Sequence, residues 1–404
     1  MRVLVCHNYY VRRSGEETVV EQEMALLQEH GHEVELFSYD NADVEEGQLA
    51  ERFQAGLRAI YSRRTPRDLR RFLQGKTFDV AHVHNTWGLM SPSIYRALWQ
   101  QGLPVVKTVH NFRWLCPIGT FYRDGHVCRD CAERFGGLIH SVIHRCYQNS
   151  LTGSSVAASR LLLNRDLLGI LRRYIDVIIV QNAFVRDLLV RHGFPAGRMM
   201  IKGNFLRRTE AAPGRRGDYA VFFGRLEASK GLSTLLDAVE RAGIPLRIFG
   251  QGPLSSWVER QVAERFGGEG PVRFEGYAPR SDLVRGVAGS RAVVFPSEWY
   301  ESYPITIVEA MAHGKPVIAS DLGSIPSIVR HEVNGLLFRP GDWEDLAEKI
   351  TRLWQDDDLQ GRLESGARAI YEAEMSSEEN YKQLIRIYEK AIVARGGRRR
   401  GSVE

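Results

Sequence analysis

The sequence predicts an α/β protein of two domains, each built on a parallel β-sheet. Three observations favour this fold class. Short β-branched apolar runs, which are typical of buried parallel strands, alternate with stretches of helical periodicity. Residues 207–217, rich in Pro, Gly and Arg, are the clearest linker in the chain. The length of 404 residues suits two or three domains of ~150 residues each. We therefore expect domains over residues 1–206 and 218–375.

The bulk composition is that of an ordinary soluble globular protein, with 44% hydrophobic and 25% charged residues. The formal net charge of +5 is mild and gives no argument for a nucleic acid partner. No run approaches the ~20 apolar residues of a membrane span. The opening sequence, MRVLVCHN, predicts a strand rather than a signal peptide. We therefore expect a cytoplasmic protein whose cysteines are reduced or bound to metal.

The first domain is predicted to open with a strand, a polar loop, a helix and a second strand. Residues 2–6 and 33–37 are the strands, and Val20, Met24 and Leu27 mark one face of the helix. This layout is Rossmann-like, but the loop lacks a G-x-G-x-x-G pattern, so a nicotinamide or flavin cofactor is not expected. Further strands are predicted at residues 79–84, 105–109 and 176–181, and a helical region at residues 151–174.

His110 directly follows the strand predicted at residues 105–109. A lone histidine is more often a structural residue. The carboxyl end of a parallel strand, however, is where open α/β sheets bind their ligands. We therefore predict that His110 lies in a ligand site.

Residues 52–76 form a strongly basic helical region in which Asp68 is the only acid. Its cations are Arg52, Arg58, Arg63, Arg64, Arg67, Arg70, Arg71 and Lys76. Such a run is usually a solvated face. It would also suit anionic lipid or a lipid-linked diphosphate, so a peripheral contact with the inner face of the membrane is the alternative.

Four of the five cysteines fall within thirty-one residues, at positions Cys116, Cys128, Cys131 and Cys146. A C-x-x-C pair flanked by two more cysteines offers four ligands for a structural, tetrahedral zinc site. His126, His140 and His144 could substitute as ligands, and free thiols or disulfides are the alternatives. Cys6, in the first strand, is expected to be a buried thiol.

The second domain is predicted to begin with a strand at residues 219–223, followed by the sequence GRLEASKG. Arg225 and Lys230 flank a turn that leads into a helix. Two cations and helix-end amides can hold a diphosphate, and solvated surface cations are the alternative. The next strands, at residues 246–249 and 272–277, lead to a GQGP turn with Gly250 and Gly252 and to a loop at Tyr277.

The most informative stretch is a predicted strand–helix–strand unit at residues 290–321. Its first strand covers residues 292–295. Glu301 sits on the following loop and Glu309 about two turns along the helix. Both can therefore face the carboxyl end of the sheet, where open α/β folds bind ligands. In isolation, such a pair is more often two solvated charges.

The surroundings of these glutamates resemble the signature of retaining glycosyltransferases of family four. The sequence reads Glu301-SYPITIV-Glu309-AMAHGKPVIAS, and GRLEASKG resembles the GRL-x-x-x-KG string of that family. The GQGP turn and the TVHNF segment resemble two more of its motifs, so the resemblance covers most of the chain. It implies the GT-B architecture, in which two Rossmann-like domains face a central cleft. It also implies a helix at residues 376–394 that crosses back to the first domain, and residues 395–404 are then a basic tail, expected to be disordered.

The resemblance implies a role for each matching residue. Glu301 would contact the donor sugar and Glu309 the ribose hydroxyls. Arg225 and Lys230 would neutralise the leaving diphosphate in place of a metal, and His110 would lie beside the donor sugar. Gly15, Gly250, Gly252 and Tyr277 stand in loops that match those expected near the donor phosphates and base.

The sequence departs from the family after the first glutamate, where many relatives have glycines and this chain has Ser302 and Pro304. Proline has no N–H, so a main-chain donor at position 304 is excluded. We expect Ser302 and the amides of Ile305 and Thr306, at the helix start, to hold sugar or phosphate oxygens.

The implied activity is transfer of a sugar from a UDP- or GDP-linked donor to an acceptor hydroxyl, with retention at the anomeric carbon. Polysaccharide or glycolipid assembly is the expected context, with a sugar, lipid-linked or small-molecule acceptor. No Asp-x-Asp pair stands out as a site for a catalytic divalent ion, so the reaction is expected to be metal-independent and to need no cofactor. Two alternatives remain open, an inverting enzyme with His7 as base and a non-catalytic subunit that binds nucleotide or carbohydrate.

Overall fold

The computed structural model describes residues 1–11, 15–42, 56–207, 217–267 and 270–400, with side chains up to residue 397 in the last range. The chain divides into two compact units. The first comprises Met1–Phe121, Cys128–Gly203 and Asn380–Glu404, and the second comprises Tyr122–Val127 and Asn204–Glu379. The division after Gly203 lies three residues before the boundary predicted from the linker, most of which (residues 208–216) lies outside the described residues.

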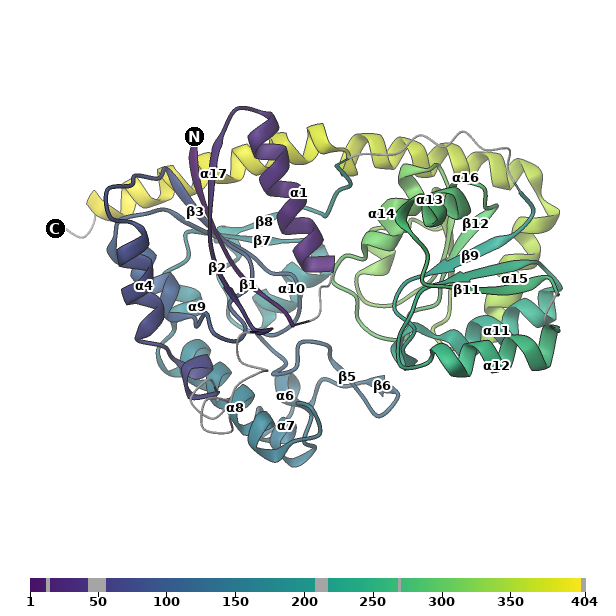
Figure 1. Cartoon of the computed structure of the whole chain (residues 1–404), viewed down its shortest axis with the longest axis horizontal. Helices are drawn as coiled ribbons and strands as arrows, with labels where there is room; N and C mark the ends of the chain where they lie inside the picture. Colours follow the sequence, from purple (N-terminus) through teal and green to yellow (C-terminus); the bar gives the residue numbers. More distant parts are fainter. Residues whose placement is uncertain (12–14, 43–55, 208–216, 268–269, 401–404) are drawn as a thin grey trace. The chain divides into compact units, whose positions relative to one another are not determined.

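The first unit is built on six parallel strands in the order β2-β1-β3-β4-β7-β8 (Figure 1). The strands are β1 (Arg2–Tyr9), β2 (Glu33–Asp40), β3 (Val80–Val83), β4 (Val105–Thr108), β7 (Val177–Val180) and β8 (Met199–Ile201). From β1 the chain moves to β2 on one side and then to β3 on the other. The carboxyl ends of β1 and β3 are therefore a topological switch point, where open α/β sheets bind ligands.

β1 is three residues longer than the sequence predicts. Residues 7–9, expected in a polar loop, pair in register with residues 38–40 of β2. Polarity was the reason for predicting a loop, but polar residues extend a strand wherever a neighbouring strand offers matching backbone groups. This extension places His7 inside the sheet rather than on the loop that follows it.

Helices cover both faces of this sheet. They are α1 (Gly15–Glu29), α4 (Arg64–Phe72), α5 (Ser93–Gln100), α6 (Asp130–Glu133), α7 (Ile139–Ile143), α8 (Leu151–Leu161), the π-helix η1 (Leu162–Leu167), α9 (Ile170–Arg173), α10 (Ala183–Arg191) and the 3-10 turn η2 (Ala196–Arg198). The helical region predicted at residues 151–174 is thus three segments. Gly169, with a φ of +59°, separates η1 from α9.

The second unit holds another six parallel strands, in the order β11-β10-β9-β12-β13-β14. The strands are β9 (Ala220–Phe223), β10 (Leu246–Phe249), β11 (Val272–Gly276), β12 (Ala292–Phe295), β13 (Val317–Ser320) and β14 (Gly335–Phe338). The order reverses between β9 and β12, as in the Rossmann fold. A short hairpin of β5 (Tyr122–Arg123) and β6 (His126–Val127) is grouped with this unit.

Two buried apolar clusters fill the faces of the second sheet. Phe222 and Val294 belong to one cluster, and their neighbours Val221 and Val293 belong to the other. Successive side chains of a strand point to opposite faces, so near-continuous apolar runs are what a sheet covered on both faces requires. The covering elements are η3 (Ala228–Lys230), α11 (Leu232–Ala242), α12 (Ser255–Phe266), α13 (Arg280–Ala288), α14 (Ile305–Ala312), η4 (Ile325–Ser327), α15 (Trp343–Gln355), α16 (Asp357–Ile370) and η5 (Tyr371–Met375). The prediction of two α/β domains with parallel sheets is confirmed.

The last helix, α17 (Ser377–Arg400), completes the core of the first unit from residue Asn380 onward. Its buried side chains Leu384, Ile387 and Tyr388 pack in one cluster with residues of β1, β3, β4 and β7. The predicted end at residue 394 is wrong, because the helix continues to Arg400 in place of a disordered tail. Residues 401–404 lie outside the described residues.

Arg395 explains why α17 does not stop where the sequence predicts. Its guanidinium is buried, donates a hydrogen bond to the carbonyl oxygen of Trp99 and lies 4.3 Å from the centroid of the Trp99 ring. These contacts hold the turn that precedes two helix-destabilising glycines. Among the described helices, none is both long and apolar enough to cross a bilayer.

Candidate functional site

The loops that follow β9 and β12 form a candidate site in the second unit. The two strands pair directly, and the backbone N–H of Glu298 donates to the carbonyl oxygen of Ser229 at 2.8 Å. Gly231 makes this approach feasible. It has a φ of +64°, and a Cβ atom there would lie 2.0 Å from the carbonyl oxygen of Pro296. Any side chain at position 231 would therefore push the two loops apart.

An ion pair between Lys230 and Glu301 joins these loops. The Nζ atom of Lys230 lies 2.5 Å from Oε1 of Glu301, a residue that is 8% exposed. The same oxygen accepts hydrogen bonds from Ser297 Oγ at 2.8 Å and from Trp299 Nε1 at 2.6 Å. The ammonium also lies 4.9 Å from the centroid of the Trp299 ring. The positive charge of Lys230 is thus held in one place at the carboxyl edge of the sheet.

Arg225 lies on the same loop as Lys230 but is far more open to solvent. Its side chain is 57% exposed, against 16% for Lys230. Its Nε atom lies 3.2 Å from Oε2 of Glu227, whose other oxygen accepts a hydrogen bond from Ser229 Oγ at 3.1 Å. The loop therefore offers one fixed cation and one exposed cation to an anionic ligand.

Glu309 projects from α14 and pairs with Arg280, the first residue of α13. The Glu309 side chain is only 12% exposed. Burial raises the pKa of this carboxyl, and the Arg280 guanidinium opposes the rise. Sequence analysis missed Arg280, as it missed Ser297 and Trp299. Its only signal was a position just beyond the loop that starts at Tyr277.

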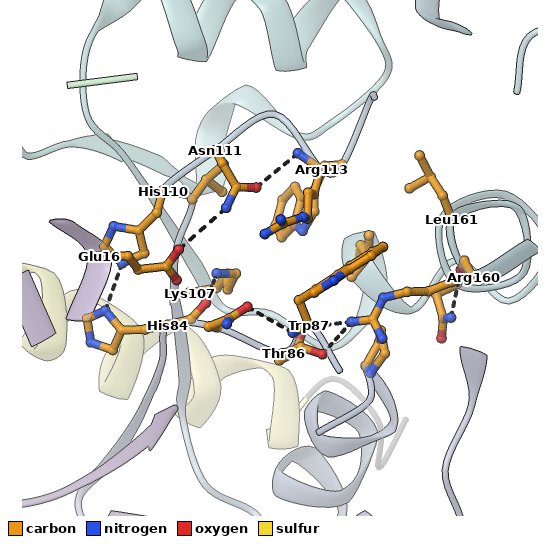
Figure 2. A pocket seen from close by; sticks show the side chains of 16 residues that line it. Glu16, His84, Thr86, Trp87, Lys107, His110, Asn111, Arg113, Arg160 and Leu161 are labelled. Atoms are coloured by element: carbon orange, nitrogen blue, oxygen red, sulfur yellow. Dashed lines mark hydrogen bonds between the residues drawn. The ribbon is translucent and has the colours of Figure 1, made fainter. Parts of the chain in front are cut away.

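A pocket in the first unit lies at the carboxyl ends of β3 and β4 (Figure 2). Trp87 enters it from the segment after β3, His110 and Arg113 from the segment after β4, and Glu16 from the start of α1. Asn111 donates to Oε2 of Glu16 at 3.4 Å. Figure 2 shows these side chains converging from elements that are far apart in sequence. The pocket therefore combines a carboxylate, an imidazole and a guanidinium beside an aromatic ring.

Two guanidinium groups contact the ring of Trp87. That of Arg113 lies 4.7 Å and that of Arg160 lies 5.1 Å from its centroid. Arg160 is buried and donates to the carbonyl oxygens of Ala59 and Thr86. Burial lowers the pKa of Arg160 to about 10. Donors, acceptors and an aromatic face in one pocket suit a polar ligand with ring faces and hydroxyl groups, such as a sugar.

A row of buried histidines lies behind the pocket. His110 Nε2 and His84 Nδ1 share a hydrogen bond of 2.9 Å, and His82 is hydrogen-bonded to Thr108 Oγ1 at 2.7 Å and to Tyr388 of α17 at 2.9 Å. Burial lowers the pKa of all three imidazoles well below the usual range, and nearby cations lower it further. The imidazoles are therefore neutral at pH 7. His110 carries no charge, and its ring nitrogens are hydrogen-bonded to His84 and, at 3.5 Å, to Nε2 of Gln181.

A buried ion pair supports these histidines. Glu23 Oε1 lies 2.5 Å from Lys202 Nζ, and both side chains are 2% exposed. Within the described part of the chain, the other oxygen, Oε2, has no hydrogen-bond partner, and it lies 3.6 Å from His84 Nε2 and 3.8 Å from His82 Nδ1. Glu23, His82 and His84 could together ligate a metal ion. The ammonium of Lys202 already neutralises the carboxylate, so this group does not fit a divalent ion.

Both domains match glycosyltransferase families. Residues 14–205 match the family described as Glycosyl transferase 4-like domain, and residues 208–370 match the family described as Glycosyl transferases group 1. Each half of the chain therefore resembles a glycosyltransferase domain. The two matched ranges meet within three residues of each other, at the segment predicted as the linker.

The curated relatives of this chain include two mannosyltransferases. The O-antigen chain mannosyltransferase C of Escherichia coli is 30% identical over 173 residues, which are 42% of this chain and 46% of that protein. The phosphatidyl-myo-inositol mannosyltransferase of Mycobacterium leprae is 32% identical over 183 residues, 43% of this chain and 47% of that protein. The chain thus spans about half the length of the curated relatives that it matches.

Solved structures match the chain over nearly its whole length. HepE of Anabaena, in complex with UDP and glucose, has a TM-score of 0.65 and 18% identity and covers 96% of this chain and 98% of that chain. Sucrose-phosphate synthase of Thermosynechococcus elongatus has a TM-score of 0.68 and 18% identity, with 97% and 99% covered. These matches show that the fold is GT-B.

The predicted donor-binding glycines of the glycosyltransferase have a clear structural reason. Gly250 adopts a φ of +141°, and a Cβ atom there would lie 1.9 Å from the carbonyl oxygen of Gly224. At Gly252 the added Cβ would lie 2.3 Å from the carbonyl oxygen of Leu226. These glycines let the loops after β9 and β10 touch through their backbones. A direct contact of either glycine with the donor stays a prediction.

The remaining predicted donor-binding residues are at least partly accessible. Tyr277 is 74% exposed, and Gly15, the first residue of α1, is also exposed. Ser302, Ile305 and Thr306 are half-buried around the first turn of α14, where no side chain caps the helix. Amides in the first turn of a helix have no intrahelical partner, so those of Ile305 and Thr306 are free to hold an anion.

His7, the base of the inverting alternative, is fully buried in β1. Neither of its ring nitrogens has a hydrogen-bond partner among the described residues, and Nε2 lies 3.9 Å from Oε1 of Glu17. It is not among the side chains that line the pocket of Figure 2. To act as a base, His7 would first have to become accessible to an acceptor hydroxyl.

The four predicted zinc ligands all lie in the first unit, and none of them forms a disulfide. The pKa of Cys131 is raised to about 12, first by burial and then by the neighbouring Cys116 and Cys146. Two groups of described residues bring potential ligand atoms within 4.8 Å of one another, and neither contains a cysteine. The zinc site therefore stays a prediction. It requires about one zinc per chain in elemental analysis of protein purified without chelator, and metal-free protein would contradict it.

Proposed function

We propose that the glycosyltransferase moves a sugar from a UDP- or GDP-linked donor to an acceptor hydroxyl, with retention at the anomeric carbon. The observation that carries this proposal is the Lys230–Glu301 ion pair at the switch point of the second sheet. It supplies a fixed positive charge and a carboxylate at the edge where α/β sheets bind nucleotides. The HepE structures contain UDP and glucose, which supports a nucleoside diphosphate sugar as the donor class.

Lys230 and Arg225 act on the leaving diphosphate. Breaking the bond between the anomeric carbon and the phosphate oxygen leaves negative charge on the diphosphate. A cation that is already in position stabilises this charge without reorganisation in the transition state. Glu301, Ser297 and Trp299 hold the ammonium of Lys230 in that position. Arg225 is exposed and free to close on the outer phosphate oxygens.

The carboxylates and His110 orient the donor in this proposal. Glu301 faces the sugar, and Glu309, kept close to α13 by Arg280, accepts hydrogen bonds from the ribose hydroxyls. His110, as a neutral imidazole, lies beside the donor sugar. The acceptor oxygen forms its bond to the anomeric carbon as the phosphate leaves, and its proton passes to the departing phosphate oxygen. The chain then needs orientation and electrostatics more than a protein base.

The pocket of the first unit is the proposed acceptor side. Its aromatic ring, carboxylate and guanidinium groups suit a glycan or another hydroxyl-bearing molecule. The curated relatives include O-antigen and phosphatidyl-inositol mannosyltransferases, which support polysaccharide or glycolipid assembly as the context.

The test begins with thermal unfolding in the presence of UDP- and GDP-sugars. A donor at a hundred times its dissociation constant stabilises the protein by ~2.7 kcal/mol. The donor that binds is then supplied with candidate acceptors, and the anomeric configuration of the product is assigned by NMR. A retained configuration supports the proposal. An inverted product would replace it with the inverting mechanism, and binding without turnover across the acceptor panel would favour a non-catalytic subunit.

A further inference from the structure

Exposed apolar side chains gather on one short part of the first unit. Sixteen large hydrophobic residues are exposed among the described residues, and seven of them fall within residues 135–168. They are Phe135, Ile139, Ile143, Leu151, Leu162, Leu167 and Leu168. Phe135 is completely exposed, at 104%. Single exposed apolar residues are common on protein surfaces, but such a concentration marks an interaction site.

The same part of the chain is net positive. Residues 134–173 contain six arginines and one acid, Asp166. Arg134, Arg145 and Arg173 are exposed, and Arg160 is buried. Arg134 is paired with Asp130 at 3.0 Å. The one acid, Asp166, is paired with its neighbour Arg165 at 2.7 Å.

These residues lie on elements that contact one another. α7 contacts α8, α8 contacts η1, and η1 contacts α9, and Figure 1 shows α7 and α8 side by side. Residues 56–61 pack against the same elements, because Asn164 Nδ2 donates to the carbonyl oxygen of Ile60 at 2.8 Å and Arg160 donates to that of Ala59. This packing brings another exposed apolar residue, Leu57, to the edge of the group.

We propose that these eight apolar residues and the exposed arginines among them, here called the apolar–basic surface, dock on an anionic lipid bilayer. Apolar side chains would enter the boundary between headgroups and acyl chains, and the arginines would pair with lipid phosphates. The exposed Arg145 and Arg173 decide for a lipid surface, because an anionic bilayer offers negative charge in every direction around the apolar contact. The proposal concerns a surface outside both candidate sites and does not rest on the proposed reaction.

This surface differs from the membrane contact predicted at residues 52–76. Residues 52–55 lie outside the described residues. In residues 56–76, the exposed arginines of α4 and its surroundings are accompanied by one exposed large apolar residue, Leu57. Arg64 of that helix is also paired with Asp68 at 3.0 Å. Charge alone attracts a protein to a bilayer, but stable binding needs apolar insertion as well.

Vesicle co-sedimentation tests the proposal without any donor or acceptor. The full chain should sediment with vesicles of phosphatidylcholine containing 30% phosphatidylglycerol and far less with pure phosphatidylcholine. Salt at 0.5 M should weaken the binding, since it screens the arginines. The triple variant Phe135→Ser, Ile139→Ser, Ile143→Ser should bind at least tenfold more weakly. Arg145→Gln and Arg173→Gln should each weaken binding about fivefold.

Matched controls separate the surface from a general change in the protein. Val393→Ser removes an apolar side chain that is 74% exposed outside the surface, and Arg241→Gln removes an exposed arginine from the second unit. Both should bind vesicles like the unchanged chain, and circular dichroism should show that every variant is folded. Equal binding to both vesicle types, or unchanged binding by the triple variant, would overturn the proposal. The surface would instead be assigned to a second copy of the chain if three results were obtained together. The chain would not bind vesicles, light scattering would show a dimer, and the triple variant would be a monomer.

Discussion

Each unit places a polar site at the carboxyl edge of a six-stranded parallel sheet, yet the two sites hold their charges in opposite ways. In the second unit, Lys230 and Glu301 come from two short loops and remain 16% and 11% accessible at the side chain. In the first unit, Glu23 and Lys202 are 2% accessible and stand behind neutral histidines. An accessible ion pair can exchange its partner for a ligand, while a sealed pair can only hold the fold. The ion pair of the second unit is therefore the one that can act on a charged ligand, and the ion pair of the first unit stabilises the fold.

The largest effect should come from opening the sealed pair. Glu23→Gln leaves the ammonium of Lys202 buried without a carboxylate, which costs about 3–5 kcal/mol when one partner of a buried pair is removed. Urea unfolding followed by circular dichroism measures this loss. Binding of a nucleotide by the second unit should persist, and its disappearance would show that the two units are not separate in this respect.

Two control variants sharpen this result. Glu23→Gln combined with Lys202→Met removes both charges and should recover part of the lost stability. Arg352→Ala breaks an exposed pair with Glu332 and should cost about 1 kcal/mol or less. A double variant that is no more stable than Glu23→Gln would show that the loss of stability does not come from the unpaired ammonium of Lys202.

Removing the accessible cations should spare the fold and reduce turnover. Lys230→Ala and Arg225→Ala should each lower turnover about a hundredfold or more, the scale for losing one preorganised charge stabiliser. Lys390→Ala, an exposed lysine on α17, is the control and should turn over normally. Near-normal rates in both site variants would remove the diphosphate role from this loop.

A pH series tests the buried charge of the pocket. Lys107 donates to the carbonyl oxygens of His84 and Thr108, and burial lowers its pKa to about 8. Between this pH and the ~10.4 of free lysine, the unfolded chain binds a proton that the folded chain has lost, so folding becomes more favourable as pH rises.

The comparison is with Lys107→Met, which cannot titrate. From pH 7 to pH 9.5, the free energy of unfolding of the unchanged chain should rise by about 2 kcal/mol relative to that of the variant. A difference between the two proteins that stays constant over this range would show that Lys107 keeps its proton.

The smallest expected effect concerns divalent ions. If Lys230 and Arg225 alone neutralise the leaving diphosphate, EDTA should leave initial rates unchanged. The control is the same assay with added magnesium or manganese. If EDTA abolishes activity and either metal restores it, a divalent ion takes part in the reaction, and Lys230 and Arg225 do not neutralise the diphosphate alone.

The sequence predicted the elements whose signals are local. The strands β7, β9 and β12 follow from continuous apolar runs, because a parallel strand buried on both faces needs such a run. Lys230 and Glu301 follow from family motifs on loops after adjacent strands. The motifs predict that Lys230 and Glu301 lie near each other. Their direct contact could not be predicted, because it depends on β9 and β12 being neighbours in the sheet.

Features that depend on distant contacts were not predicted. Glu23 and Lys202 are 179 residues apart, and a glutamate within an amphipathic helix gives no sign that it is buried. The pocket of Figure 2 joins Glu16, Trp87 and Arg160 from three separate regions. The continuation of α17 past residue 394 depends on Arg395 meeting Trp99, 296 residues earlier. All of these contacts depend on the order of the strands in the sheet. No short stretch of sequence determines that order.

The place of α17 in the first unit determines the order in which the two units can fold during synthesis. The cluster formed by β1, β3, β4 and β7 includes Leu384, Ile387 and Tyr388, which leave the ribosome only after the second unit has been synthesised. The intervening stretch Asn204–Glu379 takes about 10 to 35 seconds to synthesise at ~5–20 residues per second. During that interval the second unit can finish folding while the first waits with an uncovered apolar face. The half of the chain that is made first is therefore the half that matures last.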